Sequence, residues 1–238
     1  MHPPIKFLHL IFTVLLLGLV QPGHGQPGPH YVLAESGLNL RASADPGSKR
    51  LTTLPYATQV ILLEDPPGKE LTIENLKGAM VKVDADGQYG YVFSGYLSQY
   101  PAPFEDMSLE KYIELARGAD QNVYYESHYY DYGGYFRDDE GVTLPQSSWQ
   151  EAFVLARQLG DIPKGLKFPP AQPGETQYEN PDKPEMAWTD ELRAVRDARG
   201  KLQKLVYSFR TEGSGRSVAI TPGENPGSFL LMIGAIAD

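Results

Sequence analysis

His128 is the only histidine between residues 104 and 238, and imidazole is the side chain that most readily exchanges a proton near neutral pH. Serines and carboxylates of the same region could complete a Ser-His-Asp set, which is recognised by its geometry. The sequence has no Gly-x-Ser-x-Gly segment of the kind that exposes a serine nucleophile. We therefore interpret His128 as a strand residue and assign no catalytic residue.

Three consecutive acids, Asp138, Asp139 and Glu140, could hold a calcium ion. The ordered ligand spacing of a calcium-binding hand is absent around them. A zinc site has still less support, because this region offers one histidine and the chain has no cysteine. We therefore predict a solvated turn over residues 138–141, and no metal or other cofactor.

Six tyrosines lie between Tyr124 and Tyr135, on a segment with strand propensity. Alternation of side chains along a strand places Tyr130 and Tyr132 on the face that also carries His128. One face is expected to fill the core, while the other could present an aromatic surface to a glycan or a protein. Core packing is the expected role of these rings, and Tyr130 and Tyr132 are also candidate ligand-binding residues.

The composition limits the classes of function. The chain has 238 residues, of which 41% are hydrophobic and 21% charged, as is typical of a globular protein with one or two domains. A net charge of −9, without a Lys/Arg cluster, argues against nucleic-acid binding. The absence of cysteine excludes disulfides, thiolate metal sites, a cysteine nucleophile and lipid attachment to an N-terminal cysteine.

The N-terminus has the pattern of an export signal. After Lys6, residues 7–20 are almost wholly apolar, which fits a signal-peptide core of about 7–15 residues and is short of the ~20 needed to span a bilayer. Gly23 and Gly25 provide the spacing that a signal peptidase reads. We predict a signal peptide over residues 1–25, with an uncleaved membrane anchor as the alternative. The cleaved chain should have no membrane span and should be periplasmic, cell-surface or secreted.

Short strands and frequent turns follow. Turn residues recur at Pro46-Gly47, Pro66-Pro67-Gly68 and Asp86-Gly87. The runs with strand character cover residues 38–41, 51–54, 59–63, 80–83 and 89–93. This spacing predicts a small all-β barrel over residues 27–100.

The order of short motifs in this region resembles that of a bacterial SH3 (SH3b) domain. The motifs, in chain order, are Leu38-Asn39-Leu40-Arg41, Pro46-Gly47, Leu54-Pro55, Thr58-Gln59-Val60, Val81-Lys82-Val83, Gly90-Tyr91-Val92 and Tyr96-Leu97. The sequence departs from the family at Met80, where a Trp usually precedes the Val-Lys-Val strand, and at Ala57, which replaces a Gly. Residues 71–78 have the character of an insertion.

The resemblance implies a non-catalytic module of exported bacterial proteins, which binds a cell-wall peptide or glycan or docks beside a hydrolase. Because buried polar groups must be paired, we interpret Asn39 and Arg41 as structural residues. The candidate ligand-binding residues of the barrel are its aromatic side chains, namely Tyr56, Tyr89, Tyr91, Phe93 and Tyr96.

Residues 101–107 begin with Pro-Ala-Pro and are predicted to form a stiff linker. Over residues 108–238, apolar residues recur at helical spacing after Ser108 and after Ser148, and Glu151 completes a capping box with Ser148. Residues 161–187 carry six prolines and are predicted to be a loop, and alternating strands follow it. This order predicts an α+β domain of no recognised family, with two helices on one face of an antiparallel sheet.

Three functions are compatible with these patterns. The first is an exported, non-catalytic binding protein whose SH3b module recognises a cell-wall peptide, a glycan or an envelope protein. The alternative is a cell-wall hydrolase with its catalytic unit in residues 108–238 and SH3b as its targeting arm. A purely structural periplasmic partner is the third. We favour the first, because the sequence shows no catalytic set.

Overall fold

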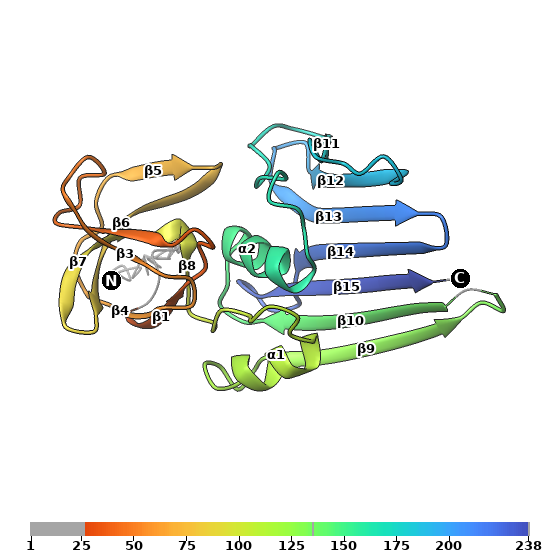
Figure 1. Ribbon diagram of the computed structural model, residues 1–238, viewed down its shortest axis with the longest axis horizontal. Helices are drawn as coiled ribbons and strands as arrows, with labels where there is room; N and C mark the ends of the chain where they lie inside the picture. Colours follow the sequence, from red (N-terminus) through yellow and green to blue (C-terminus); the bar gives the residue numbers. More distant parts are fainter. Residues whose placement is uncertain (1–26, 135, 238) are drawn as a thin grey trace, which may run out of the picture.

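The computed structural model describes residues 27–134 and 136–237, which form two antiparallel sheets with two α-helices (Figure 1). The predicted signal peptide over residues 1–25 lies outside the described residues, as does Tyr135. In the part of the chain that the structure describes, no helix combines the length and the apolar run needed to cross a membrane. The fold is thus a small β barrel followed by an α+β unit, as the sequence predicts.

The first sheet curls into the barrel, with strand order β3-β2-β7-β6-β4-β1-β8 and with β5 paired to β6. Its elements are β1 (Gly28–Val32), β2 (Leu38–Arg41), β3 (Arg50–Leu54), β4 (Gln59–Leu62), β5 (Glu70–Ile73), β6 (Leu76–Ala85), β7 (Gln88–Phe93), the 3-10 helix η1 (Ser94–Tyr96) and β8 (Leu97–Ser98). Leu38 and Leu40 are buried inside the barrel, so Asn39 and Arg41 lie on its outer face. This outer face of β2 is where the candidate site begins.

The second sheet has the order β11-β12-β13-β14-β15-β10-β9. Its elements are α1 (Leu109–Ala116), β9 (Tyr124–Asp131), β10 (Phe136–Leu144), α2 (Trp149–Leu159), β11 (Glu175–Glu179), β12 (Thr189–Arg196), β13 (Leu202–Thr211), β14 (Ser214–Pro222) and β15 (Phe229–Ala237). Both helices lie over one face of this sheet, and α2 covers the end nearest the barrel (Figure 1). Val142, Leu231, Ile220 and Leu205 are register partners on that face and are all buried.

Two local predictions for this half are wrong. Residues 138–141, expected as a solvated turn, lie within β10 and pair with both β9 and β15. Backbone hydrogen bonds on both sides override the turn preference of the acids, and Arg137 Nε donates to both carboxylate oxygens of Asp139, at 2.9 and 2.8 Å. Residues 161–187, expected to be a loop, contain β11, which pairs with β12.

The two halves meet along a packed junction. Residues 101–103 are buried, and the Tyr56 hydroxyl donates to the Pro103 carbonyl oxygen at 2.7 Å. Tyr100 is fully buried and its hydroxyl donates to the Pro145 carbonyl oxygen. One continuous cluster of buried apolar side chains runs from the barrel into the second half. The division into residues 27–100, 101–107 and 108–238 stays a prediction.

Tyr112, on α1, provides a stability test at this junction. Its side chain is fully buried, and its hydroxyl has no hydrogen-bond partner among the described residues. Since an unpaired buried hydroxyl is unfavourable, Tyr112→Phe should raise the free energy of unfolding by about 1 kcal/mol in urea denaturation. Tyr100→Phe is the control, because it removes a hydroxyl that is paired, and should lower it by a similar amount. Equal losses in both variants would contradict this account.

Candidate ligand-binding site

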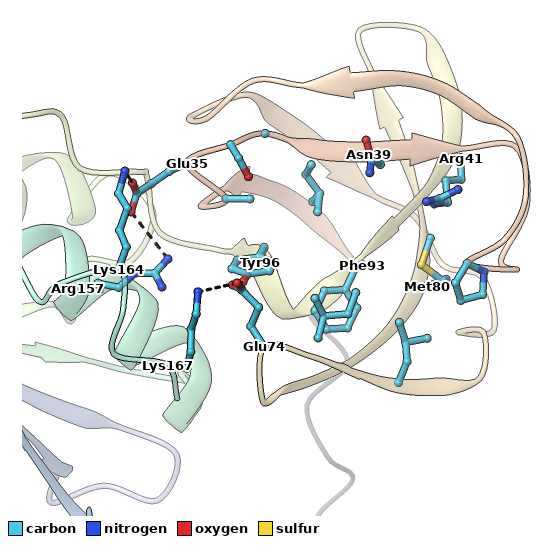
Figure 2. A pocket seen from close by; sticks show the side chains of 17 residues that line it. Glu35, Asn39, Arg41, Glu74, Met80, Phe93, Tyr96, Arg157, Lys164 and Lys167 are labelled. Carbon is cyan, nitrogen blue, oxygen red and sulfur yellow. Dashed lines mark hydrogen bonds and ion pairs between the residues drawn. The ribbon is translucent and has the colours of Figure 1, made fainter. Parts of the chain in front are cut away.

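A cavity of about 560 Å³ lies between the outer face of the barrel and the second half of the chain (Figure 2). Its barrel wall comes from β2, the β5–β6 hairpin, the end of β7 and η1. Its other wall comes from Arg157, near the end of α2, and from Lys164 and Lys167 in the loop that follows. The cavity therefore exists only where both halves of the chain are present.

The pairing register of β6 and β7 determines which of their residues form the barrel wall of the cavity. Met80 on β6 lies opposite Phe93 on β7, and both line the cavity from the outer face of the barrel. The Phe93 ring lies against two glycines, because a Cβ added at Gly78 or Gly95 would stand 2.8 or 2.4 Å from its atoms. The β5–β6 hairpin turns at Glu74, which has a φ of 50°. The expected insertion over residues 71–78 is thus a hairpin that forms one side of the cavity.

Asn39 and Arg41 also line the cavity, and each has a structural contact. Arg41 Nη1 donates to the Ser48 carbonyl oxygen at 2.6 Å, and Thr53 Oγ1 donates to Asn39 Oδ1 at 3.1 Å. Their interpretation as structural residues is therefore incomplete, since the same side chains form part of a cavity wall.

Two carboxylates connect the walls (Figure 2). Glu35 accepts a hydrogen bond from Gln158 Nε2 at 2.6 Å and pairs with Lys164. Burial acts to raise the pKa of Glu35, but the bonds from Lys164 and Gln158 outweigh it and leave that pKa below its usual range. Glu74 Oε1 pairs with Lys167 Nζ at 2.6 Å.

The second of these carboxylates also holds a ring of the barrel. Glu74 accepts a hydrogen bond from the Tyr96 hydroxyl. The bonds from Lys167 and Tyr96 lower the pKa of Glu74, while burial and the nearby Glu74 carboxylate raise the pKa of Tyr96. Both Glu35 and Glu74 are therefore held as carboxylates at neutral pH.

The charge of the cavity differs in sign from that of the whole protein. The cationic side chains that line it are Arg41, Arg157, Lys164 and Lys167, and the anionic ones are Glu35 and Glu74. This leaves an excess of two positive charges in a chain whose net charge is −9. A cavity of this charge attracts anionic groups.

The structure brings together two of the candidate residues, Phe93 and Tyr96, whose rings meet edge to face at 6.1 Å and line the cavity. Tyr91, two residues before Phe93 on β7, is not part of the cavity lining, and its hydroxyl donates to Asp65 Oδ2 at 2.9 Å. Tyr89 is exposed further along the same strand, and Tyr56 belongs to the junction, where burial raises its pKa to about 12. Their role in ligand binding stays a prediction.

Tyr130 lies near the end of β9 that points away from the barrel, and Tyr132 directly follows that strand (Figure 1). The expectation that such rings fill the core is wrong for both, since Tyr130 is 41% and Tyr132 52% exposed. The cause is that β9 is an edge strand that extends beyond the cover of α1 and α2. Their rings stack on each other at 6.1 Å.

His128 does not join a catalytic set in the described part of the chain. It is exposed on β9, 6.4 Å from the Tyr130 ring, and its register partner Asp139 is bound by Arg137. No serine in the described ranges is hydrogen-bonded to it. Residues 27–134 and 136–237 also contain no group of three or more His, Cys, Asp or Glu side chains that could hold a metal ion.

Sequence reasoning missed the residues of the second wall. Arg157 occurs in an otherwise apolar stripe of α2, and Lys164 and Lys167 lie in a proline-containing loop, so no local pattern marks them. The sequence did contain one signal for the cavity on the barrel side. Met80 stands where the resembled family usually has a Trp, and an aromatic residue there could line a groove.

The sequence profile of one known family, the bacterial SH3 domain, matches residues 36–98. No curated protein and no solved structure shows significant similarity to the chain. Bacterial SH3 domains commonly bind cell-wall components or proteins and are typical of extracellular or cell-wall proteins. The motif order, the barrel and this match agree: residues 36–98 are a bacterial SH3 domain, and an α+β unit of no recognised family follows it.

Proposed function

We propose that the protein is an exported, non-catalytic binding protein, and that the cavity on its SH3 domain holds a cell-wall peptide, a glycan or a segment of an envelope protein. The observation that carries the proposal is the cavity of about 560 Å³, which falls within the ~300–1,000 Å³ of small-ligand sites. Its position against the outer face of β2, β6 and β7 puts it on the matched family domain.

The lining suits an extended peptide or a sugar. Phe93 and Tyr96 supply aromatic surface, and Leu71 and Ile73 supply apolar surface from the β5–β6 hairpin. Apolar walls with a few polar groups are the usual composition of a ligand site, and Asn39 is such a group here. Met80 lines the cavity where the resemblance leads us to expect a Trp, and its thioether leaves room that an indole would fill.

Met80→Trp tests the proposal. The indole should occupy the cavity and reduce retention of residues 26–238 on purified sacculi or envelope extract by at least about tenfold, which corresponds to 1.4 kcal/mol. Met186→Trp is the matched control, since Met186 is 70% exposed and lies outside the cavity lining. Far-UV circular dichroism and thermal unfolding should show both variants folded.

Ile73→Ala at the exposed rim of the cavity is a second variant that costs little stability, and it should weaken retention several-fold. Full retention of both cavity variants would reject the site, and no retention of the unmodified protein would reject the function.

A further inference from the structure

Arg157 is a buried cation at the wall of the cavity whose hydrogen-bonding capacity the described protein does not use in full. Its residue is 9% exposed, and its Nε has no hydrogen-bond partner among the described residues. Its ion-pair partner in the described part of the chain is Glu35, with 3.8 Å between Arg157 Nη2 and Glu35 Oε1, which is too long for a hydrogen bond. Arg157 belongs to α2, outside the matched SH3 domain.

A buried guanidinium with unpaired N–H donors favours an anionic partner that has two oxygen atoms. Guanidinium carries five N–H donors in a planar fork, and buried donors are almost always paired. The fork matches the two oxygens of a carboxylate, with which it forms parallel charge-assisted hydrogen bonds. Since Arg157 lines the cavity, a ligand there can pair with its guanidinium, whose Nε itself is covered by protein.

The carboxylates already in the cavity do not meet this need. Glu35 is engaged by Gln158 and Lys164, and Glu74 is engaged by Lys167 and Tyr96. These bonds hold the carboxylates of Glu35 and Glu74 against Lys164 and Lys167, and neither carboxylate is hydrogen-bonded to Arg157.

The lysines themselves are weaker anchors than Arg157. Lys164 is mostly exposed and Lys167 about half exposed, so water and salt screen their charge. The guanidinium of Arg157 is buried, so water and salt screen its charge least.

We propose that the cavity recognises a free carboxylate of its ligand, and that Arg157 binds this carboxylate with its guanidinium fork. The proposal deepens the proposed function and rests on it, because it names the ligand as an acidic peptide rather than a neutral glycan. The guanidinium fork also matches the oxygens of a phosphate, so inorganic phosphate is the competing ligand in the titration below.

The first experiment follows the Arg157 Hε–Nε signal by NMR in residues 26–238. Titration with acetyl-Ala-Ala, which ends in a free carboxylate, should shift this signal, and titration with the methylamide of the same peptide should leave it in place. Arg199→Gln, at an exposed hairpin turn, is the matched control and should titrate like the unmodified protein. Equal shifts with acid and methylamide, or a larger shift with inorganic phosphate, would overturn the carboxylate proposal.

The second experiment compares retention on untreated sacculi and on sacculi whose carboxylates have been converted to methylamides. Conversion should reduce retention of the unmodified protein at least tenfold. Arg157→Gln should lose retention to the same degree and respond no further to conversion. Arg157→Lys, which keeps the charge but lacks the fork, should fall between them. Urea unfolding of each variant confirms that it is folded.

The two proposals fail in different ways. If Met80→Trp loses retention while Arg157→Gln keeps it and stays sensitive to conversion, the carboxylate proposal is wrong and the proposed function stands. If the unmodified protein is not retained on any sacculi or extract, the proposed function is wrong, and the NMR titration still decides whether Arg157 binds a carboxylate.

Discussion

Replacing Glu151 with alanine should lower the free energy of unfolding by about 4 kcal/mol, the largest loss we expect from a single substitution. The Glu151 carboxylate accepts hydrogen bonds from Ser98 Oγ at 2.7 Å, from the Gln99 backbone N–H at 3.0 Å and from Ser147 Oγ at 2.9 Å. The Ser148 backbone N–H also donates to it. Alanine would leave these donors unpaired in the junction, where each unpaired group costs ~1–3 kcal/mol.

Glu151→Gln is the control for shape, because glutamine keeps one carbonyl oxygen and nearly the same volume. It should cost about 1 kcal/mol, since serine hydroxyls can also accept from its amide group. Urea denaturation at pH 7, with the midpoint and slope compared, measures both variants. A loss in Glu151→Ala no larger than in Glu151→Gln would show that the carboxylate does not hold the junction.

The same pair of proteins gives a pH test. Burial raises the pKa of Glu151 above its ordinary value of 4.5, although the bonds from Ser98 and Ser147 act to lower it. The folded protein therefore binds this proton more tightly than the unfolded chain, and stability falls as pH rises from about 4.5 through the raised pKa. The advantage of the unmodified protein over Glu151→Gln should be greatest below pH 4.5 and shrink above it. The pKa values of Glu35 and Glu74 are lowered instead, but both proteins contain these residues, so their effect drops out of the comparison.

The second large effect concerns the whole chain, which should unfold in a single transition. The buried apolar cluster is continuous across the junction, and Tyr100 alone should contribute ~1.5–3 kcal/mol by its burial. A fragment of residues 27–103 loses this cover together with the bonds to Glu151. It should therefore be less stable than the same residues in the full chain by about 3 kcal/mol or more.

Two probes can follow this transition in the two halves separately. Both tryptophans, Trp149 and Trp188, lie after residue 108, so their fluorescence reports the second half. Amide hydrogen exchange at Leu40 and Val92, which are fully buried, reports the barrel. Coincident urea midpoints are expected. Separated midpoints, with the fragment as stable as the intact barrel, would show two independent domains.

Short-range patterns were sufficient for much of the fold. Asp86-Gly87 predicts a hairpin, and both residues adopt positive φ between β6 and β7. Ser148 and Glu151 predict the start of a helix, and Ser148 Oγ accepts from the Glu151 backbone N–H at 3.1 Å. These predictions succeed because a turn or a cap involves residues within about four positions of each other.

The same reasoning failed where distant strands decide the outcome. Asp138 and Asp139 favour a turn locally, but pairing with β9 and β15 makes them strand residues. Tyr130 and Tyr132 look like core residues by type, but their strand is at the edge of the sheet beyond the helices. No pattern within a strand states its place in the sheet.

The residues of the candidate site also fall into a group that the sequence indicates and a group that only the folded structure reveals. The sequence by itself determined the barrel, the aromatic candidates Phe93 and Tyr96 and the departure at Met80, because these follow from residue type and motif order. Only the tertiary structure decided that Arg157 faces these residues and that its Nε lacks a partner among the described residues. Glu35 and Arg157 are far apart in the chain and meet only because the junction packs α2 against the barrel. That meeting depends on packing between elements, which is a property of the folded chain.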